Sequence, residues 1–317
     1  MSSHDLSPLQ GRLLVWFAER GRDLPWRRTR DPYRILVSEI MLQQTQVDRV
    51  IPKYLAFLEA FPTLEALAAA PTAEVIRLWQ GLGYNRRAVN LQRAARAVRD
   101  EHSGAFPREV EALRRLPGVG PYTAGAVACF AFEQDVAFVD TNIRRVLRRS
   151  LVGPDGASPE PTDRELLALG QALVPAGRGW AWNQAIMELG ALVCTAAAPA
   201  CRQCPLRADC RAHAAWVAAD EAAVLAMGAP AAAPPARARR VAERREAPYE
   251  GSRRWFRGRL VDALRALPHG AALPLAELGP LVKPGFAPDE LPWLRELAAG
   301  LARDGLVALE GDAARLP

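Results

Sequence analysis

Four of the chain's five cysteines lie within one short segment, and no other feature of the sequence constrains the fold as strongly. The spacing C-x6-C-x2-C-x5-C joins Cys194, Cys201, Cys204 and Cys210. Four thiolates are the ligands that a [4Fe–4S] cluster requires, and four cysteines also suit a tetrahedral structural zinc site. The spacing favours the cluster and leaves zinc as the alternative. Such clustering indicates a metal centre in a reducing compartment instead of a disulfide framework.

The first 220 residues are predicted to be almost entirely helical, because apolar residues recur there at helical spacing without the alternation typical of strands. One helical run is expected to start at Pro32 and to extend as far as Ile51. Its apolar stripe consists of Ile35, Leu36, Ile40, Val47 and Ile51. Further helices are expected over residues 84–101, 108–115, 121–132, 141–151, 162–173 and 180–192. The fifth cysteine, Cys129, lies among Ala128, Phe130 and Ala131 in this pattern and is predicted to be a core residue.

The remaining third of the chain divides into two parts of different composition. Residues 221–248 are rich in alanine, proline and arginine, which predicts a linker. Residues 249–317 return to an ordered pattern, with amphipathic helices expected over Arg254–Leu267 and Leu291–Asp304. Two short apolar runs on either side of Gly311 predict a hairpin. The fold class is therefore mainly α, with a small C-terminal α+β module that resembles a winged helix.

The formal net charge of +6 suggests a polyanionic partner. Basic and acidic residues balance in 249–317, so the excess lies in residues 1–248. Lys53 and Lys283 are the only lysines among 41 lysines and arginines, which leaves two candidates for any mechanism that needs a lysine amine. The first residues lack the apolar core of a secretory signal, and no apolar run approaches the length of a membrane span. We expect a cytoplasmic, nucleoid-associated protein.

The segment Leu116-Pro117-Gly118-Val119-Gly120-Pro121-Tyr122-Thr123-Ala124 lies between two predicted helices. A Gly-x-Gly turn at the start of a helix leaves backbone N–H groups exposed at the positive end of the helix dipole. Such donors bind a phosphate without reading the base sequence. Gly118 and Gly120 are therefore predicted phosphate-binding positions in a helix-hairpin-helix motif.

Two acidic residues are candidate catalytic groups. Glu39 belongs to a strongly apolar helix, where a carboxylate is costly unless it is paired or functional. Asp140 opens the segment Asp140-Thr141-Asn142 before another helix, so it also fits a simple N-cap. For Glu39 the plain alternative is a satisfied structural carboxylate. From the residues alone, both alternatives stay open.

Taken together, these features resemble the base-excision DNA glycosylases of the helix-hairpin-helix superfamily, and the likeness is closest to the MutY-type adenine DNA glycosylases. The resemblance covers about residues 6–215. Besides the hairpin, Asp140-Thr141-Asn142 and the four cysteines, it rests on Leu24-Pro25-Trp26-Arg27, the segment from Ser38 to Val47, Gly81-Leu82-Gly83-Tyr84 and Met187-Glu188-Leu189-Gly190-Ala191.

The resemblance implies a glycosylase region over residues 1–220, built from two helical modules. A six-helix barrel would span about 30–135, and an iron–sulfur module would combine the N-terminal helix with about 136–220. A linker at 221–248 and the module at 249–317 would follow. The implied partner is double-stranded DNA that carries a mismatched or damaged base, bound by a monomer that flips the base into a pocket.

The resemblance also implies roles for individual residues. Glu39 matches the general acid that protonates the leaving base, and Asp140 matches the carboxylate that stabilises the oxocarbenium-like sugar. Tyr122 and Asn142 match catalytic positions that support this pair, together with Glu188. Further matches are Leu24, Trp26 and Arg27 in the wall of the base pocket and Gln44 and Tyr84 as residues that wedge into the base stack.

Two departures from the family pattern leave alternatives open. Thr141 stands where the family usually has glycine, and residues 249–317 are too few for the Nudix-like domain with which MutY-type proteins read 8-oxoguanine. A thymine or uracil glycosylase for G·T and G·U mismatches is therefore an alternative, and a non-catalytic DNA-binding protein is a more distant one. Tyr122 occupies the position where lyase-type relatives carry a nucleophilic lysine, so we expect a monofunctional enzyme.

Overall fold

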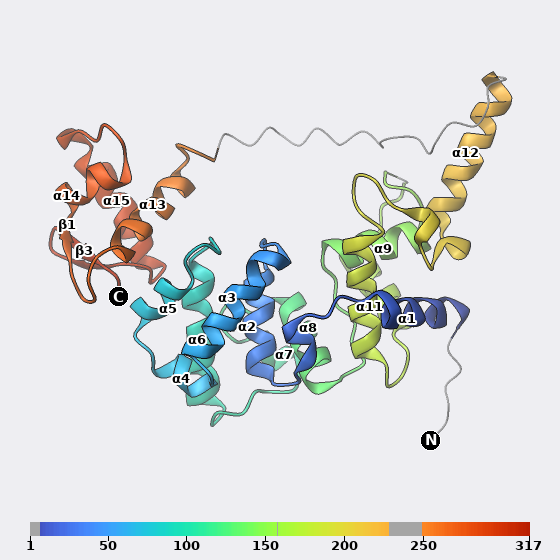
Figure 1. The fold of residues 1–317 in the computed structure, drawn as a ribbon, viewed down its shortest axis with the longest axis horizontal. Coiled ribbons are helices and arrows are strands. Elements are labelled where there is room, and N and C mark those ends of the chain that lie inside the picture. Colours follow the sequence, from blue (N-terminus) through green and yellow to red (C-terminus); the bar gives the residue numbers. More distant parts are fainter. Residues whose placement is uncertain (1–6, 157, 228–248) are drawn as a thin grey trace. The chain divides into compact units, whose positions relative to one another are not determined.

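The computed structural model describes residues 7–156, 158–227 and 249–317. Most of the expected linker at 221–248 therefore lies outside the described residues. The chain forms two compact units (Figure 1), each described here by itself. We call Met1–Arg30 with Ala124–Glu243 the cysteine unit, and Asp31–Thr123 with Arg244–Pro317 the hairpin unit. Among the described residues, no helix is both long enough and apolar enough to cross a membrane.

The hairpin unit begins with helices whose ends follow from their sequences. The Asp31 side chain accepts a hydrogen bond from the Tyr33 backbone N–H, and Pro32 occupies the first turn, so a helix starts there. Thr63 caps a later helix in the same way. The helices are α2 (Pro32–Leu42), α3 (Val47–Ala60), α4 (Leu64–Ala69), α5 (Thr72–Leu78), α6 (Arg86–Glu101) and α7 (Val110–Leu113), and α8 (Pro121–Phe132) begins in this unit.

The expected helical run from Pro32 to Ile51 is broken, which corrects that prediction. Residues 43–46 form a turn between α2 and α3, and Gln44 adopts a left-handed backbone with a φ of 57°. The break is explained by hydrogen bonds from Arg87, a residue distant in the sequence. The Arg87 guanidinium donates hydrogen bonds to the Ile40 carbonyl (2.8 Å) and the Met41 carbonyl (3.1 Å), which satisfies the last carbonyls of α2 where the helix ends.

The cysteine unit joins the N-terminal helix to a later part of the chain. The Ser7 and Gln10 side chains form a reciprocal capping box at the start of α1 (Pro8–Arg20), which packs against α11 (Gly179–Leu192). On α9 (Thr141–Leu151), Ile143, Val146 and Leu147 form the buried stripe. The remaining elements are η1 (Pro25–Arg28), the rest of α8, α10 (Asp163–Leu173), η2 (Cys201–Gln203), η3 (Arg207–Asp209) and α12 (Arg211–Met227).

Residues 249–317 form the C-terminal module of the hairpin unit. Its elements are α13 (Arg253–Arg265), β1 (Leu273–Pro274), α14 (Leu275–Val282), η4 (Pro288–Glu290), α15 (Leu291–Arg303), β2 (Ala308–Glu310) and β3 (Ala313–Arg315). The antiparallel sheet has the order β1-β3-β2, with Leu309 opposite Ala314. This arrangement of three helices and a terminal hairpin agrees with the winged-helix-like module expected from the sequence, whereas β1 and α14 were not foreseen.

The C-terminal module shares its hydrophobic core with α5 and α6. Ile76 on α5 and Val89 on α6 belong to the same buried cluster as the apolar residues of α13, α14 and α15. The backbone N–H of Ala73 also donates to the Pro317 carbonyl (3.0 Å). The module is therefore packed into the hairpin unit.

Candidate active site and cysteine loop

Glu39 is a buried acid on a buried helix. Its relative exposure is 3%, and every residue of α2 from Ile35 to Met41 is buried. Moving a carboxylate from water into such surroundings favours its neutral form, as a general acid requires. At the end of the same helix, the Gln43 side-chain amide donates to the Thr123 hydroxyl (3.3 Å), next to Tyr122 on α8. This bond links the helix of Glu39 to the hairpin.

The hairpin before α8 alternates exposed glycines with a buried anchor. Gly118 and Gly120 are exposed, whereas Val119 is buried. Gly118 has a φ of 77°, and a Cβ atom there would lie 2.7 Å from the Asn90 Cβ atom, so only glycine fits. A Cβ atom at Gly120 would meet nothing within 4 Å. The turn therefore leaves open space in front of its backbone at the helix start, which suits the predicted phosphate contact.

Both candidate wedge residues lie in turns with left-handed backbone. We name these turns the Gln44 loop (residues 43–46) and the Tyr84 loop (residues 81–85). Tyr84 has a φ of 45° and is 52% exposed, and Gln44 has a φ of 57°. Non-glycine residues in this region are strained and persist only where their surroundings hold them, which is common at functional sites.

Arg87 is a central residue of this site that the sequence did not reveal. Besides the α2 carbonyls, its guanidinium bonds the Gln43 carbonyl in the Gln44 loop. It also donates to the Leu82 carbonyl (2.9 Å) and the Gly83 carbonyl (3.1 Å) in the Tyr84 loop. Burial lowers the pKa of Arg87 to about 10, so the group remains cationic at neutral pH. One side chain therefore holds both loops.

In the cysteine unit, Asp140 combines the N-cap role with a perturbed carboxyl group. Its side chain accepts hydrogen bonds from the Ile143 backbone N–H (2.6 Å) and from the Asn142 side-chain amide (3.3 Å). Burial raises the pKa of Asp140 above its usual value, although these hydrogen bonds act in the opposite direction. Asp140 therefore caps α9, and the same hydrogen bonds orient its desolvated carboxyl group.

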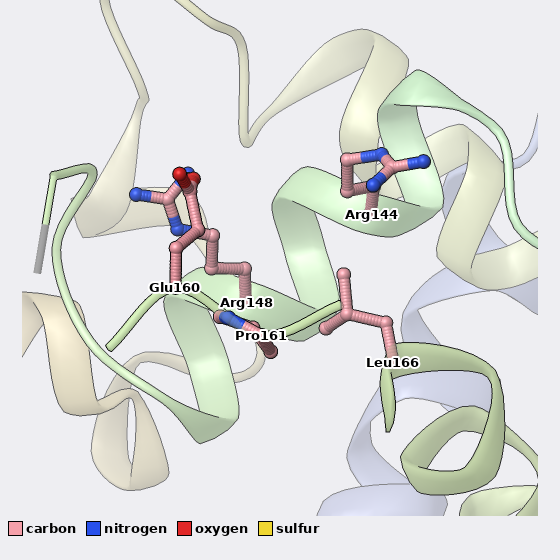
Figure 2. Close-up of a pocket in the computed structure, with 5 residues that line it drawn as sticks. All are labelled: Arg144, Arg148, Glu160, Pro161 and Leu166. Atoms are coloured by element: carbon pink, nitrogen blue, oxygen red, sulfur yellow. The ribbon is translucent and has the colours of Figure 1, made fainter. Parts of the chain in front are cut away.

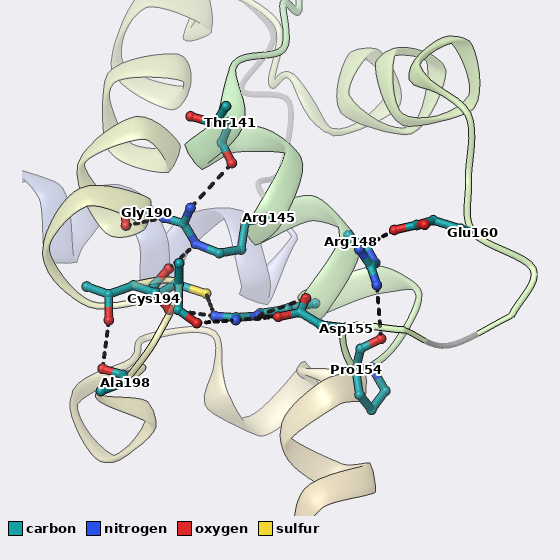
Figure 3. Close-up of polar contacts among 12 residues, drawn as sticks. Thr141, Arg145, Arg148, Pro154, Asp155, Glu160, Gly190, Cys194 and Ala198 are labelled. Carbon is teal, nitrogen blue, oxygen red and sulfur yellow. Dashed lines mark hydrogen bonds and ion pairs between the residues drawn. The ribbon is translucent and has the colours of Figure 1, made fainter. Parts of the chain in front are cut away.

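Arg145 connects this turn to the cysteine loop, as Figure 3 shows. Its guanidinium donates to the Asn142 side-chain carbonyl (2.8 Å), the Gly190 carbonyl (2.6 Å) and the Cys194 carbonyl (2.6 Å). A Cβ atom at Gly190 would lie 2.7 Å from the Asn142 Cβ atom, so α9 and α11 approach each other closely there. The position of Asn142 is thus fixed by the same side chain that holds the first cysteine.

Glu188 anchors the Leu24–Arg27 segment. It is 1% exposed and accepts hydrogen bonds from the Arg22 Nε atom (2.8 Å) and from an Arg27 Nη atom (2.9 Å). Burial opposes ionisation, but the two arginines outweigh it and lower the pKa of Glu188 to about 2. Leu24 and Trp26 are themselves buried. The structure gives Glu188 a structural task, while its role toward a base, and the roles of Leu24, Trp26 and Arg27, stay predictions.

The four cysteines form a loop that is held by Arg149. The Arg149 guanidinium lies 3.7 Å from the Cys194 Sγ atom and donates to the carbonyls of Thr195 (2.7 Å) and Ala196 (3.0 Å), while the Cys210 thiol donates to the Arg149 carbonyl (3.4 Å). Burial, together with the other three cysteines, raises the pKa of Cys204 to about 12. Four deprotonated thiols in one loop would repel one another, and a bound metal centre would neutralise their charge.

Within the described parts of the chain, no three cysteine, histidine or acidic side chains converge as a single metal ion would require. A zinc ion draws its ligands in to Zn–S distances of about 2.3 Å, whereas a four-iron cluster spreads its thiolates over a larger body. Cys194, Cys201, Cys204 and Cys210 are thus the candidate ligands both for the cluster and for the alternative zinc ion.

A hollow beside α9 is unrelated to these groups. Figure 2 shows Arg144, Arg148, Glu160, Pro161 and Leu166 around it. Its arginines are neutralised, since Arg148 pairs with Glu160 and Arg144 with Asp163. None of the expected site residues lines it.

The two units divide the expected site residues between them. The hairpin unit holds Glu39, Gln44, Tyr84, Gly118, Gly120 and Tyr122, and the cysteine unit holds Leu24, Trp26, Arg27, Asp140, Asn142, Glu188 and the four cysteines. The juxtaposition of Glu39 with Asp140 stays a prediction.

Comparisons with known proteins agree with this architecture. The model of the HhH-GPD superfamily of base excision DNA repair proteins matches residues 37–171. The adenine DNA glycosylase of Mycolicibacterium smegmatis is 43% identical over 261 residues, which cover 82% of this chain and 80% of that protein. The human adenine DNA glycosylase is 47% identical over 220 residues, 66% of this chain but 40% of the human protein.

A solved structure of a thermostable thymine-DNA glycosylase matches with a TM-score of 0.60 and 34% identity, over 65% of this chain and 95% of that one. The mycobacterial alignment covers a larger share of the chain than residues 1–248 make up, so it reaches into the C-terminal module. The match to the mycobacterial adenine DNA glycosylase covers more of this chain, at higher sequence identity, than the match to the thymine-DNA glycosylase. The comparisons therefore favour the adenine enzymes. The chain is a member of the adenine DNA glycosylase family, within the helix-hairpin-helix superfamily of base excision repair proteins.

Proposed function

We propose that the chain is a monofunctional DNA glycosylase that removes adenine mispaired with 8-oxoguanine or guanine. The observation that carries the proposal is the presence of two desolvated carboxyl groups, Glu39 and Asp140, in a chain 43% identical to an adenine DNA glycosylase. Asp140 also caps α9, but a non-catalytic DNA-binding protein would have no evident use for the Glu39 carboxyl group, which is costly to bury.

In the proposed reaction, Glu39 donates a proton to a ring nitrogen of the flipped adenine, because a neutral purine leaves more readily than an anion. Asp140 stabilises the positive charge that develops on the sugar as the N-glycosidic bond breaks. Asn142 holds the Asp140 carboxylate by its side-chain amide. Water then adds to the sugar and gives up a proton to the Glu39 carboxylate, which regenerates the acid and leaves an abasic site. Tyr122 and Asn142 are the polar groups proposed to assist this step.

DNA binding is assigned to the exposed turns of the hairpin unit. Gly118 and Gly120 would present backbone N–H groups to a phosphate. Gln44 and Tyr84 would enter the base stack, and the energy of unstacking a mispaired base is lower than that of a matched one. The segment Leu24–Arg27, held by Glu188, would provide a wall of the base pocket.

The cofactor proposed for Cys194, Cys201, Cys204 and Cys210 is a [4Fe–4S] cluster. Bound there, it would neutralise the four thiolates and fix the loop that Arg145 and Arg149 tie to α9. Broad absorbance near 400 nm, with about four irons per chain, would support the cluster, whereas one zinc per chain would support the alternative.

We further propose that the protein acts as a monomer on double-stranded DNA, in the cytoplasm at the nucleoid. Lyase chemistry is not expected, since Tyr122 takes the place of the nucleophilic lysine. Borohydride trapping of a covalent protein–DNA adduct at the rate of base release would contradict the monofunctional mechanism.

The experiment that tests the function compares four duplexes, carrying A opposite 8-oxoguanine, A opposite G, T opposite G and U opposite G. Base release under single-turnover conditions should be fastest for the adenine duplexes. The likeness to a thymine-DNA glycosylase makes T or U release the competing outcome. Glu39→Gln should bind the adenine duplexes and release no base, while Glu59→Gln, an exposed acid on α3, should behave as wild type.

A further inference from the structure

Two arginines fasten the C-terminal module to α5 and to the start of α6. From the α5 side, Arg77 bonds the Arg265 carbonyl and donates to the Leu267 carbonyl (2.8 Å). From the module side, the Arg265 side chain on α13 reaches back. Its Nε atom donates to the Ile76 carbonyl (3.0 Å), and an Nη atom donates to the Asn85 side-chain oxygen (2.8 Å).

Asn85 accepts a hydrogen bond from Arg265 and does not form the usual N-cap hydrogen bond of α6. Asn85 is the N-cap residue of α6, where an asparagine side chain normally accepts a hydrogen bond from its own helix. Here the side chain makes no such cap bond and accepts from Arg265 instead. The first turn of α6 is therefore tied to a residue 180 positions away in the sequence.

Asn85 directly follows Tyr84, so this tie acts on the Tyr84 loop. Tyr84 keeps a left-handed backbone although more than half of its side chain is exposed. Arg87 holds the loop at the carbonyls of Leu82 and Gly83, and Arg265 holds its far end at Asn85. A strained, exposed loop that is fixed at both ends keeps its aromatic side chain in one place.

The burial of Arg265 indicates that its hydrogen bonds to Ile76 and Asn85 do more than attach the module. Arg265 is 8% exposed, whereas its acidic neighbour Asp262 is largely exposed. The apolar core shared with Ile76 and Val89 already attaches the module, and a buried guanidinium adds a desolvation cost that a hydrophobic residue of the same size would avoid. In some proteins, a buried ionic group of this kind serves to define one specific geometry.

We propose that Arg265 is a positioning residue, through which the C-terminal module holds the Tyr84 loop in the conformation that wedges into mismatched DNA. The inference rests on the proposed function for the part that Tyr84 plays on DNA. It assigns to residues 249–317 a role in discriminating mismatched from matched duplexes without a base contact of their own.

The test compares Arg265→Met with Arg259→Met in the full-length, cluster-loaded protein. Arg259 lies on the same helix and donates hydrogen bonds to the Val282 carbonyl (2.6 Å) and the Leu281 carbonyl (2.7 Å), both inside the module, so its loss should perturb the module alone. Arg265→Met should speed hydrogen exchange over residues 80–87 at least tenfold, and Arg259→Met should leave exchange there unchanged. Asn85→Ala, which cuts the same bond from the other side, should reproduce the effect with Arg265 and the module intact.

On DNA, Arg265→Met should lower the ratio of affinities for mismatched and matched duplexes about tenfold, the size expected for a lost charge-assisted hydrogen bond. Tyr84→Ala should cause a similar loss, and the double variant should lose no more than Tyr84→Ala alone. Additive losses, or a wild-type ratio in Arg265→Met, would overturn the proposal. The hydrogen-exchange measurement needs no catalysis. It therefore tests the contact between Arg265 and Asn85 even if the wild-type protein releases no adenine.

Discussion

Replacing Glu188 with glutamine separates the structural work of this carboxylate from any chemistry on the base. The substitution keeps the shape of the side chain but removes the charge that Arg22 and Arg27 bind. The ordinary pKa of 4.5 falls to about 2 in the folded protein. A difference of this size corresponds to about 3 kcal/mol of folding free energy at pH 7, because each pKa unit is worth about 1.4 kcal/mol.

The lowered pKa of Glu188 also predicts how the stability difference between wild type and Glu188→Gln changes with pH. A depressed carboxyl pKa contributes stability that is complete above the unfolded value of 4.5 and is lost as the pH falls toward about 2. The gap between wild type and Glu188→Gln should therefore stay near 3 kcal/mol from pH 7 to pH 5. At pH 3 it should shrink to about 1.4 kcal/mol, since more than half of the extra stability is then titrated away.

Urea unfolding followed by circular dichroism, at pH 7, 5 and 3, measures this gap. Asp23→Asn is the matched control, because Asp23 pairs with Arg28 at an exposed position, where an ion pair contributes little to stability. A loss well under 1 kcal/mol for Glu188→Gln at pH 7, or a gap that does not narrow at pH 3, would refute the reasoning.

Three further outcomes are expected. Gly118→Ala should cost about 1–2 kcal/mol in urea unfolding because of its left-handed backbone and the nearby Asn90, whereas Gly120→Ala should keep stability and weaken duplex affinity by filling the phosphate position. Arg149→Gln should reduce the iron bound per chain, measured by metal analysis, since the cysteine loop loses its bonds to that side chain. Asp140→Asn should abolish base release yet be at least as stable as wild type at pH 7, because burial raises the Asp140 pKa and so penalises the ionised form; a less stable variant would contradict this.

Local patterns predicted most of the helices. The helix expected at 141–151 has the same bounds as α9, because Asp140 caps it and its apolar residues recur with helical spacing. The helix α14 was missed because Gly279 and Pro280 interrupt its sequence. A Cβ atom at Gly279 would lie 2.2 Å from the Phe286 ring, so a tertiary contact that no local pattern encodes selects glycine there.

The candidate site residues also divide into those that a local sequence pattern predicts and those that only distant contacts reveal. The hairpin glycines and the cysteine spacing are visible in the sequence because each works within one short segment. Arg87, Arg145 and Arg265 are not, since each acts on backbone or side-chain atoms far away in the chain. In a sequence whose cations are nearly all arginine, nothing marks these three among the others.

The discontinuous cysteine unit also has a consequence for synthesis of the protein. Helix α1 packs against α11, and the Gln10 side chain reaches the Leu173 carbonyl (2.9 Å). Between the end of α1 and the end of α11, the ribosome must add roughly 170 residues, which takes on the order of 10–30 s. During that time the apolar face of α1, with Leu13 at its centre, lacks its partner helix. The nascent chain should therefore present a chaperone-binding site at its beginning until the cysteine loop emerges.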